Sequence, residues 1–346
     1  TATTAAVVAT AAGGSAAIGS VKARADSNTT TLASLGNGVT MAANGAGSFS
    51  LTASGSDTQI VHARAGSGGL YAGSGAEGAT GNTATVTASV GDNAVINTGL
   101  VTVAASHDDR YAALIDSLQA SAVGASAALG RHDADVDVLT SLGAGSSITA
   151  AGPNTAGCYL SSCLQAVSIT SRNAFTQLDL GDSVQAAAGG GINGAGATST
   201  TEIIGTSKVI LGDNVGIASG RSPTAAPGPM LIQAWTELTA DDTASLTTGG
   251  LLQGAGVTAH YSARVDNEVT LGSSDALTSF GAINIGTYTT ALVRANAYVN
   301  TYGLAGVGVA DADVTVITNT NVNVGANSSL IGLADVNVVA GREGSG

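Results

Sequence analysis

The chain has 346 residues, of which 49 are glycine, 10% are charged and only 3% are aromatic. Its formal net charge is −13, with 11 Lys and Arg residues against 24 acidic residues. This balance argues against nucleic-acid binding and against docking on anionic lipid, because both need a basic surface. No run of 18 purely apolar residues occurs in the sequence, so no membrane span is predicted.

Ala and Val supply most of the hydrophobic residues, and they alternate with Thr, Asn, Ser and Asp. The alternation is plain in 311–318 and in 321–324. Apolar residues at every second position are typical of strands, and glycine every few residues would destabilise a long helix. Small side chains also fill little volume, so the layers that they join must lie close together. The sequence therefore predicts an all-β fold.

Two short motifs recur six times in chain order. The first ends in a hydrophobic residue and glycine, at 33–36, 88–91, 140–143, 209–212, 269–272 and 322–325. The second is an alternating strand, at 50–53, 102–105, 168–171, 231–234, 284–287 and 337–340. The distance from the second motif to the next first motif stays near 40 residues, whereas the link back varies in length. Such a period is the signature of stacked repeats.

We therefore predict an elongated β-solenoid, a parallel β-helix, built from about six imperfect modules as a single continuous unit over residues 1–346. A module of about 53 residues is expected to hold two or three coils. Each coil would add about 4.8 Å along the stacking axis. A long antiparallel arrangement is the alternative.

Glycine pairs and prolines punctuate this pattern. Glycine pairs or strings lie within the modules at 13–14, 68–69, 190–196, 249–256 and 303–308, with a drifted copy at 120–124. They would let neighbouring backbones approach closely. All four prolines fall in the two long links, which are predicted to be inserted loops at about 144–166 and 213–229. Cys158 and Cys163 in the longer link favour a disulfide that closes this loop.

The block from Gly303 to Ala312, followed by 322–327, resembles the repeats of giant bacterial surface proteins, the filamentous-haemagglutinin-like and autotransporter-like adhesins. The resemblance covers essentially the whole chain and rests on composition. It implies secretion, an extracellular or cell-surface location, a right-handed β-helix shaft, and a structural role in adhesion or in an extracellular filament or matrix. It offers no catalytic residues to carry over, so we predict a protein that is not an enzyme.

No motif predicts a catalytic site. G-x-S-x-G is absent, and the glycine string at 190–196 lacks the Lys and the strand–loop–helix context of a phosphate-binding loop. His107 and His132, each followed by Asp, are interpreted as residues of polar surface turns. The alternative function is a carbohydrate-active β-helix enzyme, a polysaccharide lyase or hydrolase, with carboxylates and Arg or Lys clustered in one cleft. A glycan-binding module is a further alternative, although Trp235 and the seven tyrosines are scattered.

Two acidic clusters, Asp133 with Asp135 and Asp137, and Asp311 with Asp313, have the i, i+2 spacing that puts each set on one side of a strand. Such carboxylates could bind Ca²⁺. The nonapeptide of calcium-binding β-rolls is missing, however, and solvated strand faces better explain the net charge. We predict no cofactor and no metal ligands, with calcium as the open alternative.

The expected partners follow from the register of the modules. Thr1 and Gly346 fall at nearly the same point of a module. A solenoid without capping repeats exposes strand edges at both ends. The expected partners are therefore further copies of the chain stacked end to end, or neighbouring repeats of the same chain, with surface glycans as candidate ligands. A window on a longer repetitive chain would have the same register.

Overall fold

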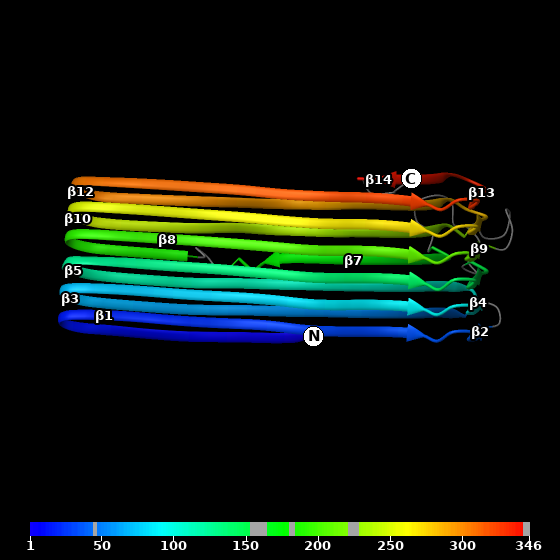
Figure 1. Ribbon diagram of the computed structural model, residues 1–346, viewed down its shortest axis with the longest axis horizontal. Coiled ribbons are helices and arrows are strands. Elements are labelled where there is room, and N and C mark those ends of the chain that lie inside the picture. Colours follow the sequence, from blue (N-terminus) through cyan, green and yellow to red (C-terminus); the bar gives the residue numbers. More distant parts are fainter. Residues whose placement is uncertain (44–46, 153–164, 180–183, 221–227, 342–346) are drawn as a thin grey trace.

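The computed structural model describes residues 1–43, 47–152, 165–179, 184–220 and 228–341, which form strands and turns with no helix among them. The long strands form a parallel sheet in the order β1-β3-β5-β7-β10-β12-β14, in which β8 also lies between β5 and β10 (Figure 1). The short strands form a second parallel sheet in the order β13-β11-β9-β6-β4-β2. The prediction of an all-β chain is confirmed, and the antiparallel alternative is wrong.

The strands are β1 (Ala2–Leu35), β2 (Thr40–Ala42), β3 (Ser48–Val90), β4 (Val95–Thr98), β5 (Leu100–Leu142), β6 (Ser147–Ala150), β7 (Val167–Gln177), β8 (Val184–Leu211), β9 (Gly216–Ser219), β10 (Met230–Leu271), β11 (Ala276–Ser279), β12 (Ile283–Val324), β13 (Ser329–Gly332) and β14 (Val336–Ala340). The described residues include no helix that is long and apolar enough to span a membrane.

Register partners are one module apart in the sequence. The separation is 55 residues between β1 and β3, 52 between β3 and β5, 69 between β5 and β8, and 53 between β10 and β12. One module thus forms one layer, meaning a long strand, the turn after it and the next short strand. The expectation of two or three coils per module is wrong, because the alternation runs through the glycine pair and 43 residues form a single strand in β3.

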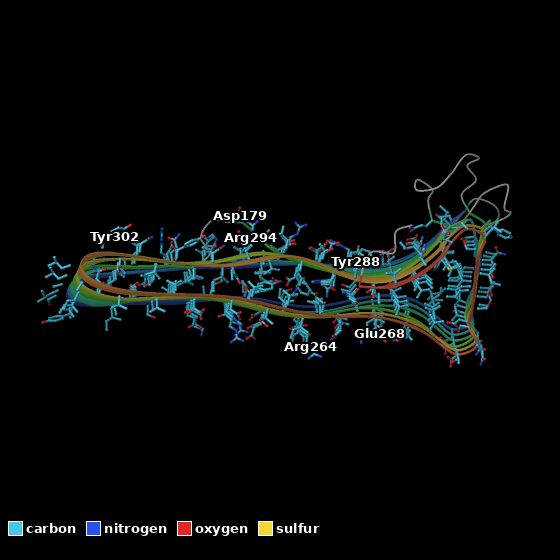
Figure 2. The ribbon with its side chains drawn as sticks, turned by 90° about the horizontal axis from the view of Figure 1, so that it is seen from above. Asp179, Arg264, Glu268, Tyr288, Arg294 and Tyr302 are labelled. Carbon is cyan, nitrogen blue, oxygen red and sulfur yellow. The ribbon has the colours of Figure 1, made fainter. Side chains whose placement is uncertain are left out.

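Each layer is a narrow loop with one wider end. The long strand folds back at a bend, so that an outgoing arm and a returning arm face each other, and the short strand closes a three-sided end (Figure 2). Successive layers superpose in this view, since their bends and turns stack in register.

The bends coincide with the predicted glycine pairs, except in the third layer, where Ala120 and Ser121 of the drifted copy occupy the bend. Gly14, Gly69 and Gly190 stand at bends with φ of 144°, 158° and 140°. A Cβ on Gly69 would lie 1.9 Å from the Gly14 carbonyl oxygen, and one on Gly303 would lie 1.7 Å from that of Gly250. Only glycine tolerates such contacts, so the predicted close approach of backbones is confirmed.

The first motif forms the turn that follows each long strand. Its glycines stack directly, and the Gly91 amide donates to the Leu35 carbonyl oxygen at 2.8 Å. A Cβ on Gly91 would lie 2.6 Å from the Gly36 carbonyl carbon. Two residues later each turn has a left-handed residue, at Gly38, Asn93, Gly145, Asn214, Ser274 and Asn327. Glycine and asparagine are the residues that adopt this conformation most readily.

The two ranges predicted as inserted loops are corrected in part. Each contains a short strand, β6 or β9, which continues the second sheet. Sequence reasoning missed these strands because four residues are too few to show alternation. Cys158 and Cys163 lie outside the described residues, so the predicted disulfide stays a prediction.

Inward side chains form two separate hydrophobic cores. The turn-end core, at the three-sided end, contains large residues such as Ile96, Ile148, Leu211, Ile217 and Leu277. The bend-end core, between the two arms, consists mostly of alanines, namely Ala23, Ala25, Ala63, Ala65, Ala76, Ala128, Ala186, Ala197, Ala244, Ala255 and Ala259. Side-chain volume therefore changes with the distance between the facing strands.

Candidate functional site

A seam of polar side chains separates the two cores inside the stack. This polar seam consists of Asp57, Gln59, Thr80, His107, Asp109, Tyr111, His132, Thr201, Asp242 and Tyr261. Each of these residues is at most 2% exposed. Since a buried polar group is costly without a partner, the contacts among these side chains decide the stability of the seam.

The shortest contact between ionisable groups in the seam is the pair His107–Asp57. His107 Nε2 donates to Asp57 Oδ2 at 2.9 Å, and both side chains are fully buried. The Thr29 hydroxyl donates to the same oxygen at 2.7 Å, and the Ala2 amide donates to Asp57 Oδ1 at 3.1 Å. Burial raises the pKa of the Asp57 carboxyl, but the hydrogen bonds from His107 and Thr29 outweigh it and leave the pKa below its ordinary value.

His132 extends the seam across to the returning arm. Its ring stacks on that of Tyr111 with a centroid distance of 3.5 Å and an angle of 4°. Its Nδ1 lies 2.9 Å from the Thr80 hydroxyl, and its Nε2 faces Asp109 Oδ2 at 3.5 Å. The Gln59 amide, with its nitrogen toward Asp109, donates to Oδ1 of that carboxylate at 2.9 Å.

Asp242 continues the seam into the fifth layer. Ser199 and Gln177 donate to its Oδ1, both at 3.2 Å, while its Oδ2 is buried without a hydrogen-bond partner. Burial raises the pKa of Asp242 above its ordinary value, against the opposing hydrogen bonds from Thr201 and Ser199. Burial also raises the pKa of Tyr111 well above its ordinary value.

The interpretation of His107 and His132 as residues of surface turns is wrong. Both lie within β5, where alternation points His107 and Asp109 inward and Asp108 outward. Adjacency of His and Asp in the sequence misled the interpretation, because neighbours in a strand face opposite sides. Alignment of the modules would have shown the seam, since Asp57 then falls on Asp109. Because its side chains are covered, the seam can orient the two arms, but a polymeric substrate has no access to it.

The two predicted acidic clusters lie on the outer surface, as their spacing predicts. Asp133, Asp135 and Asp137 point outward from β5, and Arg131 Nε pairs with Asp133 at 2.7 Å. Asp313 lies outward on β12 and pairs with His260 at 3.1 Å. Within the described part of the chain, no three His, Cys, Asp or Glu residues are grouped so that they could hold a metal ion.

Charged residues gather in one shallow groove on the outside of the returning arms. Arg24, Asp26, Arg131, Asp133 and Glu202 contribute to it. The guanidinium of Arg24 lies 2.5 Å from Asp26, and that of Arg131 lies 3.5 Å from Glu202. Each arginine is therefore already paired with a carboxylate of the chain.

One aromatic pair also lies on the outside. Trp235 and Tyr288 are register partners, and their rings stack with a centroid distance of 5.9 Å. The indole of Trp235 donates to Glu237 at 2.8 Å, and Arg172 bridges Glu237 and Asp108 at 2.9 and 2.7 Å. The structure thus brings together two aromatic residues that the sequence left scattered. The facing sides of the two rings therefore cover each other.

Both ends of the stack are open. We call the unpaired edge of β1 the N face, and the edge of β12 beyond its short pairing with β14 the C face. Inward residues of the C face are exposed where their register partners are covered. Val314 is 41% exposed above Tyr261, and Val324 is 43% exposed above Leu271, whereas both partners are at most 1% exposed. The C face thus combines exposed apolar side chains with an unpaired strand edge, whereas the inward residues Ala23 and Ala25 of the N face are buried.

No protein-family model, no curated protein and no solved structure matches this chain.

Proposed function

We propose that this chain is part of the β-solenoid shaft of a secreted bacterial surface protein, with a structural role in adhesion or in an extracellular filament or matrix. The observation that carries the proposal is the stacking of whole modules in parallel register, with bends and turns aligned from the first layer to the last and glycine in the bend of every layer but the third. A repeat of this kind can be extended without limit, because each layer contacts only its neighbours.

One chain by itself is too short along the stacking axis to form a shaft. Six layers at about 4.8 Å would rise only about 30 Å, whereas an arm of some 20 residues is about 65 Å long. One chain is therefore wider than it is tall along the stacking axis (Figure 1). A shaft requires further layers, from more copies or from more repeats.

The secreted location and the structural role are tested on the organism that makes the protein. Antibodies against the 346-residue chain would be used for immunogold labelling of intact cells. We expect gold particles on extracellular filaments or on the cell surface. Labelling confined to the inside of permeabilised cells would overturn the proposal.

A glycan-binding or carbohydrate-active role is the second candidate, favoured by the charged groove and by the Trp235–Tyr288 pair. The test is a panel of acidic and neutral polysaccharides, measured for binding and for loss of viscosity. A hit that disappears in Arg131→Ala or Trp235→Ala would establish this role and displace the purely structural one. Unchanged viscosity and no binding would eliminate it.

A further inference from the structure

Ion pairs in this stack repeatedly join residues of neighbouring layers that are direct register partners. Four pairs follow this rule: Lys22–Glu77 at 2.6 Å, Arg64–Asp116 at 3.2 Å, Lys208–Glu268 at 3.6 Å and His260–Asp313 at 3.1 Å. Residues of two adjacent layers that stack in one column on the outer surface are thus close enough to pair.

The two open faces carry opposite charges on their returning arms. Lys22 and Arg24 lie outward on β1 at the N face, both more than half exposed. Lys22 already pairs with Glu77 and Arg24 with Asp26, so a further carboxylate above them would share each cation. Asp311 and Asp313 lie outward on β12 at the C face, where no further strand covers them. Asp311 stands above Thr258, a residue without charge.

These charges occupy the same two columns. Through successive register partners, the column of Lys22 passes Glu77, Leu129, Thr198 and Thr258 and reaches Asp311. The column of Arg24 passes Ala79, Arg131, Thr200 and His260 and reaches Asp313. A further layer in the same register would therefore place Lys22 on Asp311 and Arg24 on Asp313.

We propose that the C face binds the N face of a second copy of this chain, with β1 added in parallel to β12 and the pairs Lys22–Asp311 and Arg24–Asp313 fixing the register. The inference rests on the proposed function, since it assumes that the shaft grows by continued stacking. Because the two faces differ, the contact is heterologous and repeats without closing, which produces a filament.

The remaining columns fit this occupant. Inward apolar residues meet apolar residues, as in Leu35 on Val324 and Ala25 on Val314. The bend glycines Gly14 and Gly303 share a column, so the stacked bends continue across the contact. All charged residues of β1 and β12 point outward, so no charge would be buried between copies.

Other registers lose the match. A shift of one residue would turn the inward residues of β1 to the outside. A shift of two residues in one direction would set Asp313 on Asp26, with like charges together, and in the other direction it would leave Asp311 on Ser20. Only the proposed register satisfies both pairs.

Charge reversal on each face tests the proposal. The variants are Asp311→Lys with Asp313→Arg for the C face, and Lys22→Asp with Arg24→Asp for the N face. Asp135→Lys with Asp137→Arg, at the same spacing in an interior layer, is the matched control. Sedimentation velocity and negative-stain electron microscopy would follow assembly at low salt, where charge effects are largest. We expect wild type and control to assemble, and each face variant to need at least about tenfold more protein, because like charges then meet.

Mixing the two face variants supplies the decisive measurement. In the mixture every junction again brings opposite charges together, so we expect alternating filaments at the wild-type threshold. A misfolded variant could not restore assembly, which separates loss of the contact from loss of the fold.

The outcomes distinguish this inference from the proposed function. If the wild type forms filaments and both charge-reversal variants form them equally well, the proposed register between β1 and β12 is wrong, but the proposed shaft function is unaffected. Single copies of wild type at every concentration would overturn docking between copies, and any further layers would then belong to the same polypeptide. Immunogold labelling inside the cell would overturn the shaft itself.

Discussion

The turn-end core and the bend-end core are built from the same strands but with different side chains. At the three-sided end the strands stand far apart, and Ile, Leu and Met fill the space. Between the arms, alanine dominates, and the large Ile115 is accommodated because Gly78 faces it. The comparison teaches that inward side-chain volume matches the separation of the facing strands at each point along a layer. The polar seam lies between the core of large side chains and the core of alanines.

Breaking the buried pair in the seam should have the largest effect. Asp57→Ala leaves His107 buried without its carboxylate, and such a loss costs about 3–5 kcal/mol. Thermal and urea unfolding followed by circular dichroism would measure it. The double variant Asp57→Leu with His107→Leu should recover much of the loss. An equal loss in Asp116→Ala, which removes an exposed pair with Arg64, would contradict the special role of the seam.

A cavity in the turn-end core should cause the second largest loss of stability. Leu271→Ala removes a side chain that is 1% exposed, and we expect a loss of about 2–5 kcal/mol. Val324→Ala, at the same column on the open C face, should cost less than about 1 kcal/mol when single copies are unfolded. Similar losses at the two positions would mean that the C face is covered in solution.

Overpacking the bend-end core should cause a smaller loss of stability. A Cβ on Gly78 would lie 2.0 Å from Ile115 Cδ1, so Gly78→Ala should cost about 1–3 kcal/mol by unfolding midpoint. Adding Ile115→Val should return part of this loss. Gly75→Ala is the control, because its nearest contact would be at 3.9 Å. If both glycine variants behave alike, arm separation is not set by volume.

The smallest effect concerns the pH dependence of stability. The pKa of Asp242 is raised in the folded state, so the native protein holds a proton on this carboxyl more readily than the unfolded chain does. The free energy of unfolding therefore falls as pH rises from the ordinary carboxyl pKa through the raised pKa of the folded state. Asp57 has the opposite sign, since its pKa is lowered and its contribution is lost as pH falls through the folded value. Asp242→Asn should flatten the decline in urea midpoint above about pH 4. An unchanged profile would place the titration elsewhere.

The sequence by itself determined the all-β class, the recurring motifs and glycine pairs that the structure places at turns and bends, and the outward acidic faces. Period-2 alternation and recurring glycines are local signals, and they appear directly in the order of residues. The glycine pair at 68–69 could thus be assigned to a close backbone approach before its neighbours were known.

The tertiary structure alone decided that one module makes one layer, because the number of coils depends on which distant residues pair. It also decided that His107 meets Asp57 and that Trp235 meets Tyr288, although 50 and 53 residues separate these partners. Contacts of this kind follow from the register between layers. Register is a property of the stacked backbone, and a single strand read on its own does not contain it.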